Sequence, residues 1–152
     1  MPGTSDVTQL DSISGQQTLQ KSTSGAAWVK IAGAIPVDSI PIYASSGNVA
    51  ASVATASMPA SAGRTNFLTG FEITSSGSTV AAVVNVTITG TIGGTLTYVY
   101  ATVAGVTAIN QPLIVQFTSP ILSTINTAIT VSLPSLGAGN TNAAVVVHGY
   151  QF

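Results

Sequence analysis

FLTGFEIT, at residues 67–74, opens a series of short segments in which apolar side chains alternate with threonine, serine or asparagine. Five similar segments follow it: TVAAVVNVTITG (79–90), GTLTYVYATVA (94–104), PLIVQFTSP (112–120), NTAITVSLP (126–134) and NAAVVVHGYQF (142–152). Nearly every break between them is Gly, Pro, Asn or Ser, the residues that form turns. Because each segment has the length of a strand in a compact sheet, the series predicts about six antiparallel strands.

The alternation predicts which side chains of the first two segments face the core. Phe67, Phe71 and Ile73 share one face of the first segment, and Leu68 lies on the other. The second segment gathers its apolar side chains on one face, at Val80, Ala82, Val84, Val86 and Ile88. Strands with one apolar face are typical of the two packed sheets of a β-sandwich.

Two later segments are apolar on both faces. In residues 94–104, one face carries Leu96, Tyr98 and Tyr100 and the other carries Val99, Ala101 and Val103. We therefore expect this strand to be central in its sheet or covered by a partner. The last segment has Val145 and Val147 on one face and Val146, His148, Tyr150 and Phe152 on the other. The same reasoning predicts that it is buried between layers.

A glycine-rich turn joins the second and third segments. TIGGT, at residues 91–95, contains two adjacent glycines, and a type I′ turn needs positive φ at both of its central residues. The sequence therefore predicts a type I′ hairpin centred on Gly93 and Gly94.

The chain before residue 64 differs in composition from the rest. Residues 1–27 are rich in Ser, Thr, Gln and Gly, which predicts an extended N-terminal arm held by another subunit or docked on its own body. Residues 28–63 are expected to be an extended edge or linker segment. Pro36 and Pro41 cannot donate to a ladder, so residues 28–43 belong at an edge, and the Ala/Ser-rich residues 50–62 read as a linker.

These segments define the expected architecture. Residues 64–152 form the body, an all-β antiparallel β-sandwich, and the residues before it supply an arm and edge strands. With edge strands contributed from residues 28–43, a jelly roll is the wiring that this arrangement favours.

The composition points to a protein that works in contact with others. The chain has 152 residues, enough for one domain with a core, and only 5% of them are charged. Ordinary soluble domains have about 25% charged residues. A surface of neutral polar groups with a net charge of −1 generates little repulsion between molecules, which favours packing against copies or partners.

Several function classes are disfavoured by the same composition. The 3 Lys and Arg residues are too few to neutralise a nucleic-acid backbone. No apolar run approaches the roughly 18 residues of a membrane span, and the first residues lack the pattern of a signal peptide. Cysteine is absent, so thiolate metal sites and disulfides are excluded.

The residue types that catalysis needs are scarce. His148 is the single histidine, and a catalytic triad would have to draw its acid from Asp6, Asp11, Asp38 or Glu72. A histidine within an apolar strand is more often a hydrogen-bonded structural residue. We therefore expect no enzymatic activity, no catalytic or metal-binding residue and no cofactor.

Three segments carry a resemblance to a known class of proteins. TNFLTGFEITSSGSTVAAVVNVTITG (65–90), GGTLTYVY (93–100) and NTAITVSLPSLGAGNTNAAVVVHGYQF (126–152) resemble small virion structural proteins of tailed bacteriophages, of the head decoration or cement type. The resemblance lies in the order of turns and strands and includes no catalytic signature.

The resemblance implies a capsid decoration protein that stabilises the head through contacts between subunits. It implies assembly in the cytoplasm of the bacterial host, the major capsid protein or other virion subunits as partners, and a homo-oligomer, with a trimer favoured. The alternative is a head-fibre or tail-tip module that recognises a host surface glycan. Exposed aromatic rings at loop ends would favour glycan binding, whereas rings buried between chains would favour assembly.

Large apolar and aromatic side chains are the candidate interface residues, because such side chains anchor protein contacts. They are Trp28, Val29, Ile31, Ile35, Tyr43, Tyr98, Tyr100 and Tyr150.

Overall fold

The computed structural model describes residues 35–36, 38–78 and 80–152, and these residues contain strands and turns without a helix. Residues Pro36–Phe152 form one compact unit. Its strands are β1 (Ile40–Ser45), β2 (Ala54–Met58), β3 (Asn66–Ser78), β4 (Ala82–Thr89), β5 (Leu96–Thr102), β6 (Gly105–Ile109), β7 (Leu113–Leu122), β8 (Ile129–Leu133) and β9 (Asn142–Gln151).

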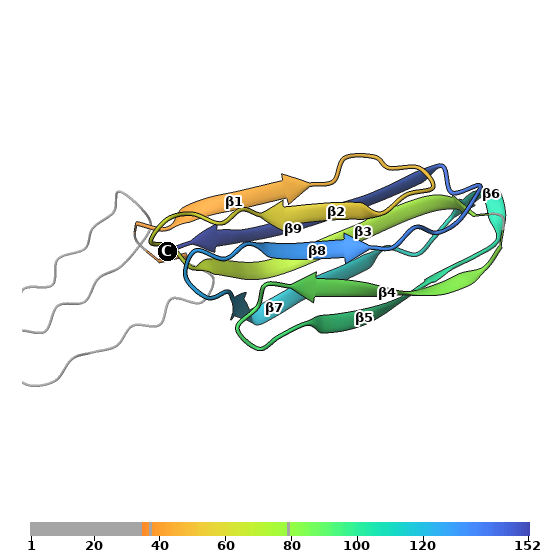
Figure 1. Cartoon of the computed structure of the whole chain (residues 1–152). Coiled ribbons are helices and arrows are strands. Elements are labelled where there is room, and N and C mark those ends of the chain that lie inside the picture. Colours follow the sequence, from red (N-terminus) through yellow and green to blue (C-terminus); the bar gives the residue numbers. More distant parts are fainter. Residues whose placement is uncertain (1–34, 37, 79) are drawn as a thin grey trace, which may run out of the picture. The chain divides into compact units, whose positions relative to one another are not determined.

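The strands form two antiparallel sheets that pack face to face (Figure 1). Sheet A has the order β1-β9-β3, and β7 and β6 pair with successive parts of the far side of β3. Sheet B has the order β2-β8-β4-β5. The chain crosses from one sheet to the other at most connections. β1 and β9, the first and last described strands in the sequence, are neighbours in sheet A. This order is the jelly-roll wiring that the sequence predicts.

The core lies between the two sheets and is apolar. Sheet A contributes Leu68, Phe71, Ile73, Val145 and Val147, and sheet B contributes Ala54, Met58, Val86, Ile88, Ile129, Val131 and Leu133. These side chains come from alternate positions along each strand, because successive residues of a strand point to opposite faces. The alternation predicted for the second segment is confirmed within β4, with Val86 and Ile88 fully buried, but Val80, placed on the same face, lies before the strand and exposes 69% of its surface.

The interpretation of residues 50–62 as a linker is wrong. Residues 54–58 form β2, an outer strand of sheet B that pairs with β8 from Ala54↔Leu133 to Met58↔Ile129. Ala54 and Met58 are fully buried. Since β1 and β2 both belong to the sandwich, the compact unit starts at Pro36 and differs from the body of residues 64–152. The edge position expected from Pro41 is confirmed, because β9 is the single partner of β1 among the described strands.

A β-bulge changes the faces of the first predicted strand. The pairing of β3 with both neighbours shifts between Leu68 and Gly70. Leu68 is consequently buried in the core, while Phe67 is only partly buried on the outer face. The predicted common face of Phe67 with Phe71 is therefore wrong, since one extra residue reverses the alternation.

The hairpin between β4 and β5 is present, but the predicted type I′ turn is wrong. The Gly94 amide donates to the Thr91 carbonyl over 3.1 Å, which places Ile92 and Gly93 at the centre of the turn. Of these residues only Gly94 has a positive φ, at 90°. Just before the turn, Gly90 also has a positive φ, at 81°.

Two strands lie elsewhere than the sequence suggests. β9 is an interior strand of sheet A, between β1 and β3, so it belongs to one layer and is not enclosed between two. Among the described strands β5 pairs with β4 alone, which excludes a central position. In the part of the chain that the structure describes, no helix is long and apolar enough to span a membrane.

Candidate interaction surface

The predicted interface residues near the N-terminus have different outcomes. Trp28, Val29 and Ile31 lie outside the described residues, as does the predicted arm, residues 1–27. Ile35 and Tyr43 are exposed, and Tyr43 shows 79% of its surface on the outer face of β1. Tyr43 is thus available to a partner, because no described neighbour covers its ring.

Tyr98 is partly buried and Tyr100 is buried, and both rings make contacts within their own chain. The Tyr98 ring packs edge to face on Phe71, with centroids 5.2 Å apart. Tyr100 is 4% exposed, and its hydroxyl lies 2.8 Å from Ser75 Oγ in the facing sheet. Burial raises the pKa of the Tyr100 phenol, and the hydrogen bond with Ser75 offsets part of this rise. Both rings serve the core of their own chain.

Tyr150 lies on the outer face of sheet A but is also covered within the chain. Its ring stacks on Phe67 at 4.8 Å with the two planes 6° apart, and 8% of its surface is exposed. The two residues are direct partners in the β3–β9 ladder, so the bulge that turns Phe67 outward creates this stack. Burial raises the pKa of the Tyr150 phenol.

His148 is half-buried on the same outer face. Its Nε2 lies 3.2 Å from the Gln116 side-chain nitrogen, and its carbonyl accepts a hydrogen bond of 2.9 Å from the Thr69 hydroxyl. Of the acids in the triad hypothesis, Asp6 and Asp11 lie outside the described residues. No three His, Cys, Asp or Glu side chains gather into a metal-binding group among the residues that the structure describes.

The outer face of sheet B is neutral and carries paired hydroxyls. Thr55 and Ser132 lie 3.2 Å apart across the β2–β8 pair, and Ser57 is hydrogen-bonded to Thr130 one step along. Near β5 this face becomes apolar, because Val83 and Val99 expose 70% and 66% of their surfaces. Neither β4 nor β5 contains a charged residue.

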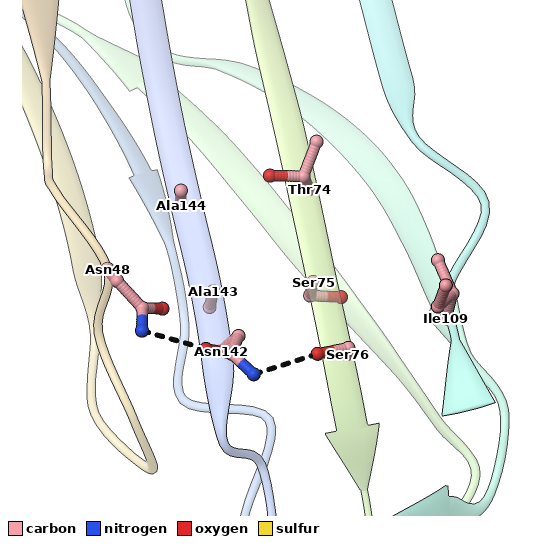
Figure 2. Close-up of a pocket in the computed structure, with 8 residues that line it drawn as sticks. All are labelled: Asn48, Thr74, Ser75, Ser76, Ile109, Asn142, Ala143 and Ala144. Atoms are coloured by element: carbon pink, nitrogen blue, oxygen red, sulfur yellow. Dashed lines mark hydrogen bonds between the residues drawn. The ribbon is translucent and has the colours of Figure 1, made fainter. Parts of the chain in front are cut away.

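A hollow of about 270 Å³ lies on sheet A where β3 ends and β9 begins (Figure 2). Asn48 Nδ2 donates to Asn142 Oδ1 over 2.8 Å, and Asn142 Nδ2 donates to Ser76 Oγ over 3.0 Å. Thr74, Ser75, Ile109, Ala143 and Ala144 also line this hollow (Figure 2). The groups in this hollow are neutral, and none is aromatic.

A second hollow, of about 300 Å³, lies beside β5. Its lining comes from β5 and from the residues that lead into β7: Val99, Tyr100, Ala101, Gln111, Pro112 and Leu113. Of these residues, the candidate interface set contains Tyr100 alone. The signal was present in residues 94–104, where apolar side chains on both faces indicated either a central strand or a covered one.

Comparisons with protein-family models, with curated proteins and with solved structures find no match to this chain.

Proposed function

We propose that this protein is a structural subunit of a tailed-bacteriophage virion, a capsid decoration protein that acts through contacts with other subunits. The proposal joins the resemblance of residues 65–90, 93–100 and 126–152 with the surface of the jelly roll. It has the major capsid protein or other virion subunits as partners and contact with further copies of itself.

One observation carries this proposal, the exposure of large apolar side chains on a surface almost without charge. Ile125, in the turn between β7 and β8, exposes 59% of its surface, and the apolar corner of sheet B exposes Val83 and Val99. The described charged residues are Asp38, Arg64 and Glu72. When a partner covers apolar groups in neutral surroundings, the contact is stabilised by about 25 cal/mol per Å² of apolar surface buried. Repetition over a lattice multiplies a small contact area.

Imaging of labelled particles tests the proposal. Particles from the phage that carries the gene are incubated with gold-labelled antibody against the purified chain and viewed by electron microscopy. We expect label at regular positions over the heads. Unlabelled particles, or label confined to the tail tip, would contradict the decoration role.

The hollow at Asn48 and Asn142 favours a second candidate, a module that binds a host glycan. Amide and hydroxyl groups can exchange hydrogen bonds with the hydroxyls of a neutral sugar. The stacking ring that such sites usually provide is missing from the lining of this hollow, and Tyr43 is the only tyrosine of the described chain with an exposed ring. Binding to a glycan array that is lost in Asn142→Ala, but kept in Asn85→Ala, would favour this candidate.

A further inference from the structure

The free side of β5 lacks the features that protect β1 and β7, two outer strands of sheet A. β1 contains Pro41, and β7 contains Pro120 and pairs with β3 through a register shift. β5 has no proline and no charge, and its pairing with β4 is continuous from Leu96 to Thr102. An uncharged outer strand with regular pairing on one side presents unpaired N–H and C=O groups to an extended chain on the other.

The space beside β5 allows such a chain to approach. The hollow of about 300 Å³ is lined by Val99, Tyr100 and Ala101 of β5 and by residues 111–113, where the chain enters β7. The side of β5 away from β4 therefore borders an open space and has no described partner strand. Figure 1 shows β5 as the outermost strand of its sheet.

We propose that β5 pairs with β5 of a second copy of this chain, antiparallel and about a two-fold axis at Val99. A symmetric contact requires a surface that is complementary to itself. The sequence TYVYA, at residues 97–101, is nearly palindromic about Val99. The axis places Val99 opposite the second copy's Val99 and Thr97 opposite its Ala101. Because β4 and β5 carry no charge, this pairing brings no like charges together.

The outer side chains extend the contact beyond the two strands. Val83 is paired with Ala101 across the β4–β5 ladder, next to Val99. The axis therefore joins the apolar corners of two copies into one row, in which each exposed valine gains an apolar neighbour. Sheet B of one copy and sheet B of the other then form one continuous sheet. Such a contact closes at two copies, so it replaces the trimer expected from the resemblance.

Cysteine cross-linking in the full chain tests the pairing directly, since the natural sequence has no cysteine. Residues directly opposite each other in antiparallel strands have Cα atoms about 4.5–5.5 Å apart, which suits a disulfide. Val99→Cys should form a covalent dimer under mild oxidation at least about tenfold faster than Ile114→Cys. Ile114 is a matched control, because its exposure of 62% is close to the 66% of Val99 and it lies on the other sheet.

A charge variant gives an independent readout. Val99→Lys places two ammonium groups at the axis and should weaken dimerisation in sedimentation equilibrium by about tenfold or more, while Ile114→Lys leaves it unchanged. The proposal is overturned if the wild-type chain sediments as a monomer or a trimer, or if the two cysteine variants oxidise at equal rates. It is also overturned if removal of residues 1–27 abolishes association, because those residues, and not β5 of the second copy, would then make the contact.

Discussion

The Tyr100 hydroxyl and Ser75 Oγ meet 2.8 Å apart inside the sandwich and link sheet B to sheet A. Asn110 Nδ2 donates to the same Ser75 oxygen over 2.8 Å, and Asn110 Oδ1 accepts a hydrogen bond from the Val103 amide. All three polar side chains are buried. The network therefore fixes the end of β5 against β3, and it explains why Tyr100 serves the core instead of an interface.

Tyr100→Phe should lower the free energy of unfolding by about 1 to 2 kcal/mol, because the ring stays packed while one buried hydrogen bond is lost. Urea denaturation measures this difference. Tyr43→Phe is the control, since its exposed ring makes no described hydrogen bond, and its unfolding midpoint should not move. Equal effects of the two substitutions would show that the inter-sheet bond contributes nothing.

The same residue should make the fold sensitive to alkali. Burial raises the pKa of Tyr100 above its ordinary value of 10.0, so folding favours the protonated phenol. This contribution to stability is complete below about pH 10 and is lost as the pH rises through the raised pKa. Urea unfolding from pH 8 to 11 should show a loss of stability that is smaller in Tyr100→Phe. A steeper loss in the variant would contradict this assignment.

Replacement of Asn66 by the isosteric aspartate should lower the stability of the fold. Its Nδ2 lies within 3.4 Å of the carbonyl oxygens of Met58, Pro59 and Thr127, and the residue is 1% exposed. Asn66→Asp replaces this donor by a buried carboxylate facing three acceptors and should cost about 3 kcal/mol at pH 7. The cost should shrink as the pH falls and the carboxyl takes up a proton. Exposed Asn85→Asp should change the unfolding midpoint little at either pH.

Substitution by alanine should strongly destabilise the fold at Gly149 and should have almost no effect at Gly93. A Cβ at Gly149 would collide with the backbone carbonyl of Phe67 and lie 2.8 Å from the Met58 methyl group. Gly149→Ala should therefore lose more than about 3 kcal/mol or fail to fold. Gly93 has no atom within 4 Å of that position, and its substitution should stay within about 0.5 kcal/mol. Thermal unfolding followed by circular dichroism compares the two, and similar midpoints would refute the predicted contrast.

The sequence predicted those parts of the fold in which side chains alternate over a long strand. β4 and β5 are examples, since one face of each carries bulky apolar residues and the phase never changes. β2 was missed because Ala54 and Ala56 are small and alternate with Thr55 and Ser57, which looks like linker composition. Its burial depends on β8 and the facing sheet, so it is a property of the tertiary structure.

The sequence indicates less clearly that the side-chain alternation reverses within β3 and that the tyrosines are covered within their own chain. Gly70 within an otherwise regular strand was the available indication of a bulge, and a Cβ there would come within 2.6 Å of the Val115 carbonyl. A tyrosine suits a core and an interface equally, because its ring is apolar and its hydroxyl is polar. Only the positions of Ser75 and Phe67 decide that Tyr100 and Tyr150 are covered within their own chain.

Removal of residues 1–27 should separate stability from assembly if the proposed decoration role is correct. The strands of Pro36–Phe152 pair among themselves, so the shortened chain should unfold at the same temperature as the full chain. Its occupancy on heads that lack the protein should fall to background, because an extended arm adds contact area across subunit boundaries. Sedimentation of mixed heads and protein, followed by gel quantification, measures occupancy. Full occupancy by the shortened chain would refute the role of the arm, whereas a lower unfolding temperature would show that residues 1–27 stabilise their own sandwich.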